Sequence, residues 1–372
     1  MKIGFIINSL ATGGAEKQTV ALINALSKEH DVILFLLKDK MNLYETVSKN
    51  ITIYNLRGKK YLDLNSIKKI KSVLEQENVR IIFTVNSYSC FMGYLASLKM
   101  NIIKVFINHT TRITSAKERI QNIYYRKIIN TMDYRIFVSL NQKNYWLNNY
   151  KIVNKNNLVI NNGISNKLYD ARLFNDSELE QLKEKYNICI DDFVILQCAI
   201  LRPEKNHIEL LIAVRNLINR GYDKIKVLLI GDGIERERLE NYINKNKLRN
   251  NVFLAGLQND VRPYYSMADL GTLTSISETF SIAALEQLSM GIPMVMPNVG
   301  GSNEMIIDGY NGFLYESKNT EELTKIIEKC CANKWKVKAM SVNAINVVNS
   351  LFTTDKMIEK YSSFITNITK VI

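Results

Sequence analysis

Residues 277–286 read Ser-Glu-Thr-Phe-Ser-Ile-Ala-Ala-Leu-Glu, and an apolar run at 293–296 follows shortly after them. Hydroxyl side chains accept hydrogen bonds from the free N–H groups at a helix start, and glycine commonly ends a helix. The stretch therefore predicts a helix that is capped by Thr279 or Ser281, runs to Met290 and is terminated by the next glycine. A helix that leads into a buried strand is the repeating unit of an α/β fold.

The same alternation of strand-like and helix-like segments extends through the whole chain. Short apolar runs that predict buried strands lie at 3–7, 32–36, 80–84, 104–107, 193–198, 226–230, 251–255 and 293–296. The chain has 372 residues, more than one core normally holds, so two domains are expected. We predict two doubly wound parallel sheets, with the ligand in the cleft between them and the polar stretch 165–192 separating the halves.

The composition narrows the class of protein. Hydrophobic residues make up 47% of the chain and charged residues 23%, which indicates a globular protein and excludes a disordered one. Five cysteines without a Cys-x-x-Cys pair argue against a disulfide framework or a spaced zinc site. No apolar run approaches the roughly 20 residues that span a bilayer, so we expect a cytoplasmic protein.

Positive charge is concentrated in the first half of the chain. Residues 1–165 hold 24 Lys and Arg against 10 Asp and Glu, whereas the remaining residues hold 25 against 26. Codon bias is one explanation, but it would not confine the excess to one half. The other explanation is that the basic half is attracted to an anionic membrane face, a lipid phosphate or a nucleic acid.

Two glutamates in the opening stretch have unusual positions. Glu278 lies at the predicted helix entrance, where free N–H groups can hold a phosphate. Glu286 lies more than a turn inside, among apolar residues, where a carboxylate can bind vicinal sugar hydroxyls. The alternative is a capped core helix with one surface glutamate.

Three further motifs follow predicted strands. Gly13 and Gly14 follow the first strand, the segment 201–207 with Arg202 and Lys205 follows the strand at 193–198, and 231–233 reads Gly-Asp-Gly. Two cations three residues apart at a strand end can bind a diphosphate. Taken alone, each glycine motif is equally compatible with an ordinary turn, and the segment 201–207 fits a solvated surface loop better than a binding site.

Together, these motifs resemble glycosyltransferase family 4. They are Gly-Gly-Ala-Glu at 13–16, Arg-Pro-Glu-Lys-Asn at 202–206, Gly-Asp-Gly at 231–233 and Glu-x7-Glu at 278–286. The resemblance spans nearly the whole chain and implies a retaining, nucleotide-sugar-dependent enzyme of the GT-B fold. It also implies an acceptor-binding Rossmann-like domain at 1–165, a donor-binding one at 166–355, and a final helix at 356–372 that crosses back to the first domain.

The resemblance implies a role for each matching residue. It assigns His109 and Glu278 to the reacting sugar as catalytic residues, Lys205 and the N–H groups of Phe280 and Ser281 to the donor diphosphate, Glu286 to the ribose, Gly256, Leu257 and Val261 to the base, and Gly13 and Gly14 to the acceptor side. Many members carry an arginine five residues before the lysine, where this chain has Ile200. Arg202 is the candidate replacement for that cation.

The resemblance and the lack of an Asp-x-Asp motif both imply transfer without a metal or other cofactor. The donor is expected to be UDP-linked, and the acceptor a glycan or lipid-linked glycan in cell-surface polysaccharide synthesis. There are two alternatives: a nucleotide-sugar epimerase of the same fold, and a non-catalytic basic protein that binds membrane or nucleic acid. Nucleic acid is not expected as a partner, because an aromatic–basic RNA-binding pattern is absent.

Residues 113–130 predict a helix with Ile113, Ala116, Ile120, Ile123, Tyr124 and Ile128 on one face. Arg112, Arg119 and Arg126 recur every seven residues beside that face. An ordinary amphipathic helix would explain the pattern, and so would a helix that docks on anionic lipid. The second reading places the protein peripherally on the inner face of the cell membrane.

Overall fold

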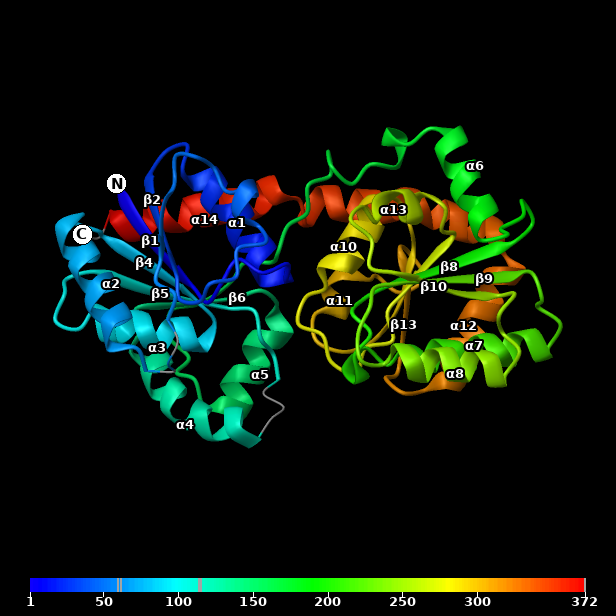
Figure 1. Ribbon diagram of the computed structural model, residues 1–372, viewed down its shortest axis with the longest axis horizontal. Coiled ribbons are helices and arrows are strands. Elements are labelled where there is room, and N and C mark those ends of the chain that lie inside the picture. The colour runs from blue at the N-terminus through cyan, green and yellow to red at the C-terminus, as the bar shows by residue number, and fades with distance from the viewer. Residues whose placement is uncertain (59, 61, 113–115, 371–372) are drawn as a thin grey trace. The chain divides into compact units, whose positions relative to one another are not determined.

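The computed structural model describes residues 1–58, 60, 62–112 and 116–370, without the side chains of 116–119. The chain forms two compact units (Figure 1). One unit contains Met1–Asn162 together with Thr354–Ile372, and the other contains Gly163–Thr353. The first unit is thus built from both ends of the chain. The division falls three residues before the predicted end of the first domain and two before the predicted start of the final helix.

The described strands of the first unit form a seven-stranded parallel sheet in the order β3-β2-β1-β4-β5-β6-β7. Strand order reverses between β1 and β4, which makes this the topological switch point of the sheet. The strands are β1 (Lys2–Ile7), β2 (Asp31–Leu36), β3 (Thr52–Asn55), β4 (Ile81–Val85), β5 (Ile103–Asn108), β6 (Tyr134–Phe137) and β7 (Asn157–Val159). The helices are α1 (Gly14–Leu26), α2 (Leu64–Gln76), α3 (Asn86–Ala96), α4 (Ala116–Thr131), α5 (Leu140–Tyr150) and α14 (Thr354–Thr369).

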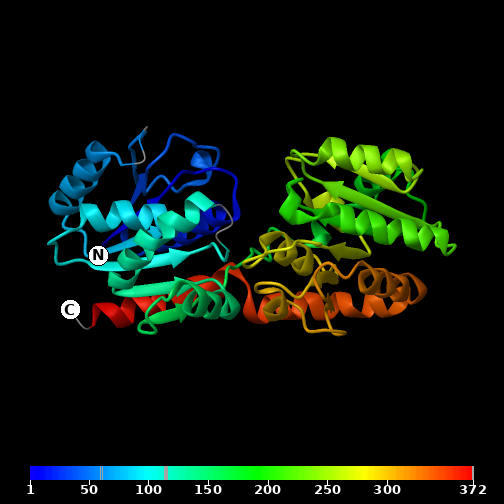
Figure 2. The same cartoon turned by 90° about the horizontal axis from the view of Figure 1, so that it is seen from below.

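The last helix, α14, is part of the core of the first unit. Tyr361 and Phe364 are buried, and their rings meet Phe83 of β4 edge-on at 6.3 and 6.4 Å. Figure 2 shows this helix, in red, beside the sheet of that unit. Because α14 contributes five buried apolar side chains to this core, the first unit includes the end of the chain.

The described part of the second unit holds a six-stranded parallel sheet in the order β10-β9-β8-β11-β12-β13. Its switch point lies between β8 and β11. The strands are β8 (Phe193–Cys198), β9 (Ile225–Ile230), β10 (Val252–Gly256), β11 (Leu270–Thr272), β12 (Met294–Pro297) and β13 (Gly312–Tyr315). The helices are α6 (Asp176–Lys185), α7 (His207–Asn219), α8 (Arg236–Lys245), α9 (Arg262–Ser266), α10 (Ile282–Ser289), α11 (Ser302–Met305), α12 (Thr320–Ala332) and α13 (Lys334–Leu351).

All eight predicted strands are present, and none is displaced by more than one residue. The predicted α/β class with two doubly wound parallel sheets is confirmed. The polar stretch 165–192 does not separate the halves, because it belongs to the second unit. Within it, the Tyr169 carbonyl accepts a hydrogen bond from Ser289 at 2.9 Å. Among the described helices, none combines the length and apolar character needed to cross a membrane.

Candidate active site

The helix predicted from residues 277–286 is α10. Ser281 is its N-cap, and its Oγ accepts a hydrogen bond from the Ala284 N–H at 3.3 Å. The last residue of the helix is Ser289 and Met290 is its C-cap, one residue short of the predicted end. This capping stabilises the start of the helix. Phe280 is buried against Phe352, with ring centroids 5.4 Å apart, which holds the residue before the cap in place.

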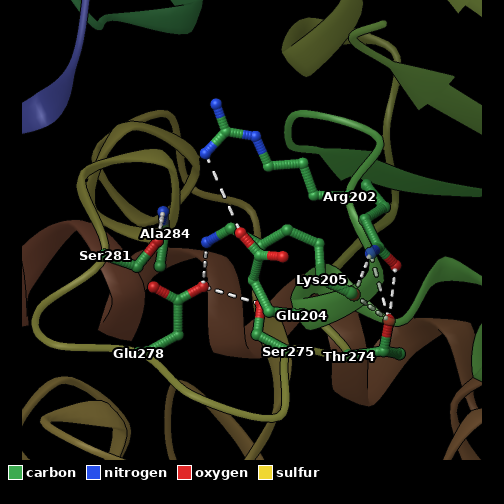
Figure 3. Close-up of polar contacts among 9 residues, drawn as sticks. Arg202, Glu204, Lys205, Thr274, Ser275, Glu278, Ser281 and Ala284 are labelled. Carbon is green, nitrogen blue, oxygen red and sulfur yellow. Dashed lines mark hydrogen bonds and ion pairs between the residues drawn. The ribbon is translucent and has the colours of Figure 1, made fainter. Parts of the chain in front are cut away.

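Glu278 and Lys205, two of the predicted site residues, are in direct contact. Glu278 is 9% exposed, and its Oε1 lies 2.6 Å from Lys205 Nζ. The same oxygen accepts a hydrogen bond from Ser275 Oγ at 2.7 Å (Figure 3). Lys205 ends a short 3-10 turn, Pro203–Lys205, that follows β8. The fold therefore brings an ammonium group and an oriented carboxylate together at the entrance of α10.

Side chains that the sequence analysis missed hold the Lys205 backbone. Thr274 Oγ1 lies 2.9 Å from the Asn206 carbonyl oxygen and 3.1 Å from that of Lys205. Gln197, at the end of β8, donates from Nε2 to Thr274 Oγ1 at 3.1 Å. Gln197 is a polar residue inside an otherwise apolar strand, and that was the one signal available in the sequence.

Gly300 is required by a close approach of the backbone. Its φ is +57°, and an added Cβ would collide with the carbonyl oxygen of Glu278. The N–H of Gly301 donates to the carbonyl of Thr279 at 2.9 Å. This Gly-Gly turn therefore packs directly against the backbone that carries the Glu278 side chain.

Glu286 is buried, at 5% exposure, so the alternative of a surface glutamate is wrong. Its Oε1 accepts a hydrogen bond from the Tyr169 hydroxyl and its Oε2 accepts one from the Tyr265 hydroxyl, each at 2.8 Å. Burial, followed by the charge of Glu286, raises the pKa of both phenols far above the ordinary value. The two tyrosines therefore remain neutral donors that hold the carboxylate in one orientation.

The residues predicted for the base lie at the carboxyl end of β10. Gly256 has a φ of +72°, and its carbonyl accepts a hydrogen bond from the Gly231 N–H at 2.9 Å. Leu257 is largely exposed, and Val261 is half-buried directly before α9. These positions form one loop of the second unit, next to the glycine turn that follows β9.

Arg202 lies at the surface. Its guanidinium is 3.8 Å from the Glu204 carboxylate, and both side chains are more than half exposed (Figure 3). Ile200, which occupies the position of the arginine in many relatives, is also exposed. The structure thus leaves Arg202 on the same loop as Lys205 but outside the ion pair of Lys205 with Glu278.

In the first unit, His109 follows β5 and is held firmly. Its backbone N–H donates to Asn86 Oδ1 at 2.9 Å, and Asn86, the first residue of α3 directly after β4, has a φ of +67°. Gln142 Nε2 and Trp146 Nε1 donate to the Thr110 carbonyl at 3.1 and 2.8 Å. Burial lowers the pKa of His109 to about 4. The imidazole is therefore neutral near pH 7 and can donate or accept a hydrogen bond.

Gly13 and Gly14 form the start of α1, at the carboxyl end of β1. An added Cβ on Gly13 would collide with the Glu16 carboxylate, which folds back over this residue. Strand β1 pairs with β4, and β4 pairs with β5. The Gly13 turn, Asn86 and His109 therefore lie at the ends of three adjacent strands, on one edge of one sheet.

Helix α4 packs with a different face than its sequence suggests. Ile120, Ile123 and Tyr124 are 62%, 50% and 66% exposed, whereas Tyr125 and Ile129 are buried. Ile128 of the predicted apolar face packs against the core, whereas the middle of that face is turned to solvent.

Of the three arginines, Arg119 and Arg126 belong to α4, and Arg112 lies before it, as it does before the predicted helix at 113–130. Arg112 precedes α4, and its guanidinium lies 5.8 Å from the Tyr145 ring of α5. Arg126 is half-buried on α4. The side chain of Arg119 and all of Ile113 lie outside the described residues.

Two doubly wound parallel-sheet units, with polar side chains gathered at the carboxyl ends of their strands, define the GT-B class of fold. Two family models match the chain. "Glycosyl transferases group 1" matches residues 179–347, and "Glycosyltransferase Family 4" matches residues 12–167. The chain belongs to glycosyltransferase family 4 and is a glycosyltransferase.

Several relatives match over most of their length. A Campylobacter jejuni N-acetylgalactosamine-N,N'-diacetylbacillosaminyl-diphospho-undecaprenol 4-alpha-N-acetylgalactosaminyltransferase is 25% identical, over 93% of this chain and 97% of the relative. An Escherichia coli UDP-Gal:alpha-D-GlcNAc-diphosphoundecaprenol alpha-1,3-galactosyltransferase is 23% identical, over 93% and 90%. The solved structure of Anabaena HepE in complex with UDP has a TM-score of 0.88 and 20% identity, over 99% of this chain and 100% of that one.

Within the described residues, no group of three or more His, Cys, Asp or Glu side chains is arranged to hold a metal ion.

Proposed function

We propose that this protein is a retaining glycosyltransferase that moves a sugar from a UDP-linked donor to a lipid-linked glycan in cell-surface polysaccharide synthesis. The observation that carries the proposal is the contact of Lys205 with Glu278 at the capped start of α10. The two bacterial relatives are named for acceptors linked to undecaprenol diphosphate, and HepE was solved with UDP. These names support the acceptor and nucleotide classes proposed here.

The donor diphosphate is assigned to the second unit. Lys205 supplies a positive charge, and the N–H groups of Phe280 and Ser281 make no hydrogen bond to other described residues. Charged donors and the positive end of a helix stabilise phosphate oxygens. Arg202, exposed on the same loop, adds a second cation when its side chain turns toward the diphosphate.

The nucleoside is assigned to the neighbouring strand ends of the same unit. Glu286 accepts one hydrogen bond from a tyrosine at each carboxylate oxygen, and we assign the ribose hydroxyls to this same buried carboxylate. We assign the base to Gly256, Leu257 and Val261, at and just after the end of β10. The orientation that Tyr169 and Tyr265 impose on Glu286 makes this carboxylate a preorganised hydroxyl acceptor.

We assign the reaction to charge stabilisation without a metal. The bond between the anomeric carbon and the diphosphate breaks, the carbon becomes oxocarbenium-like, and the acceptor hydroxyl attacks from the same face. The hydroxyl proton leaves on the diphosphate. Lys205 and the helix start stabilise the departing charge, while Glu278 and neutral His109 orient the sugar hydroxyls.

The exposed apolar side chains of α4 support a membrane-facing role for the first unit. Ile120, Ile123 and Tyr124 are exposed in a half of the chain that carries 14 excess positive charges. Apolar side chains on a basic surface bind the headgroup region of anionic bilayers. The proposal places the protein peripherally on the cytoplasmic face of the membrane, where a lipid-linked acceptor is accessible.

A liposome flotation assay tests this placement. Wild type should float with anionic vesicles and not with neutral ones, and Ile123→Ser together with Tyr124→Ser should weaken flotation. Equal binding to both vesicle types, or no binding, would contradict the electrostatic part of the proposal.

The donor site is tested by thermal shift with uridine, guanosine, adenosine and cytidine diphosphates, with and without chelator. A ligand at about 100 times its dissociation constant adds about 2.7 kcal/mol of stability. The proposal requires a shift with uridine diphosphate that survives chelator and is lost in Glu286→Gln. An NMR time course then follows the anomeric configuration, and an inverted product would contradict retention. Donor conversion without acceptor would instead indicate an epimerase.

A further inference from the structure

The backbone that carries Lys205 is held by a buried carboxylate outside the site described above. Asn206 directly follows Lys205 and adopts a left-handed conformation, with φ 49° and ψ 41°. It stands at the N-cap position of α7, but its side chain does not cap the helix. Its Nδ2 donates instead to Glu209 Oε2 at 2.6 Å. A non-glycine residue in this conformation is disfavoured and persists only where its surroundings hold it.

Asn206 is held from two sides. Its carbonyl oxygen lies 2.9 Å from Thr274 Oγ1, and its amide is held by Glu209. Lys205 is its immediate neighbour, so rotation of the Asn206 backbone would carry the ammonium away from Glu278. The direction of the Lys205 side chain therefore depends on the Glu209 contact.

Glu209 itself is in an unusual environment. It is 3% exposed, and its Oε1 has no hydrogen-bond partner among the described residues. Burial raises the pKa of this carboxyl to about 7, against the opposing effects of Asn206, the Tyr315 hydroxyl and Lys318. Glu209 thus changes charge near neutral pH.

The charged groups around Glu209 come from three elements. Tyr315 is the last residue of β13, Lys318 lies just before α12, and Glu322 lies within α12. His207 is the first residue of α7, and Lys205 lies just before that helix. Burial keeps His207 neutral by lowering its pKa to about 4, and the pKa of the Tyr315 phenol is raised far above its usual value. Glu209 is therefore the group in this cluster whose charge changes near neutral pH.

We propose that Glu209, acting through Asn206, is a positioning residue for Lys205, and that loss of its proton strengthens binding of the donor diphosphate. An ionised acceptor holds an amide about twice as strongly as a neutral one. Ionised Glu209 fixes Asn206 and hence Lys205, whereas the protonated form leaves this loop freer. The inference rests on the proposed role of Lys205 as the diphosphate ligand.

The experiment measures uridine diphosphate affinity by calorimetry, and donor KM and kcat, from pH 5.5 to 8.5 in wild type and Glu209→Gln. The glutamine keeps an acceptor oxygen for Asn206 but cannot ionise. Because the diphosphate also titrates in this range, each wild-type value is divided by the Glu209→Gln value at the same pH. As pH rises through about 7, we expect the wild-type to Glu209→Gln ratio of uridine diphosphate affinity to rise roughly fivefold and the ratio of donor KM to fall by about the same factor, with acceptor KM unchanged.

Two further variants keep the test decisive. Glu209→Asp should restore part of the pH step, and Glu237→Gln, the same change at an exposed position on α8, should behave as wild type. A flat wild-type to Glu209→Gln ratio, with uridine diphosphate bound by both proteins, would overturn the inference and leave the proposed function intact. Absence of nucleotide binding and transfer at every pH would overturn the proposed function itself.

Discussion

The ammonium of Lys205 and the carboxylate of Glu278 form an ion pair of 2.6 Å between residues 73 positions apart in the chain. Their side chains are 25% and 8% exposed, so the pair is largely withdrawn from water. Removing one partner of such a pair leaves an uncompensated charge, which is strongly destabilising.

Lys205→Met should therefore lower both stability and activity. We expect a loss of about 2–4 kcal/mol of unfolding free energy and a decrease in kcat/KM of at least about 100-fold. Combining it with Glu278→Gln should recover part of the stability and none of the activity. Urea unfolding and initial rates of the two single variants and the double variant measure both effects. Additive losses of stability would show that the pair is not coupled.

The two tyrosines that donate to Glu286 provide a second prediction. Tyr265→Phe leaves one carboxylate oxygen without its donor, and should cost about 1–3 kcal/mol and weaken nucleotide binding. Tyr242→Phe is the matched control, because its buried hydroxyl has no hydrogen-bond partner among the described residues. Thermal unfolding with and without uridine diphosphate compares them. Equal shifts for the two variants would contradict the role given to Tyr265.

His207 should make the protein less stable in acid. Both ring nitrogens are buried without partners among the described residues, and burial lowers the pKa of this imidazole to about 4. Between about pH 6.5 and 4 the unfolded chain binds a proton that the folded chain does not, so stability falls as pH falls through this range. The contribution is up to about 3 kcal/mol. His207→Leu should be less sensitive to a change from pH 7.5 to 5 in urea unfolding, and an unchanged sensitivity would contradict this reading.

Two glycines with similar backbone angles should respond differently to alanine. Gly309 has a φ of +74° with open space around it, so Gly309→Ala should cost only about 1–2 kcal/mol. Gly300 has a φ of +57°, and its added Cβ would collide with the Glu278 carbonyl. Gly300→Ala should cost clearly more and lower activity by displacing Glu278. Melting temperatures and initial rates of the two variants test this difference. Equal effects would show that the close approach of Gly300 to the Glu278 carbonyl is unimportant.

The last helix should be required for the first unit to fold. Phe364→Ala removes a buried ring that packs on Phe83 and Tyr134, and we expect a loss of about 3–5 kcal/mol. Ser363→Ala, at an exposed position on the same helix, should be nearly neutral. Far-UV circular dichroism during thermal unfolding compares them. A small effect of Phe364→Ala would mean that α14 is only loosely attached.

The local sequence pattern was sufficient to predict the longer strands and the start of α10. The long apolar runs such as 193–198 and the capped stretch before Met290 predicted their elements because hydrophobic periodicity and capping act between near neighbours. The strands not predicted, such as β11 and β13, have three or four residues each. Runs this short become strands through pairing with neighbours, which one segment of sequence does not reveal.

The sequence by itself determined the α/β class, the two-domain organisation and the residue types of the candidate site, because these depend on composition and on order along the chain. The tertiary structure alone decided the contacts between distant segments. It joined Lys205 to Glu278, surrounded Glu286 with Tyr169 and Tyr265, and turned Ile123 of α4 toward solvent. The physical reason is that burial and hydrogen bonding at these positions depend on residues far apart in the chain, which only the folded structure brings together.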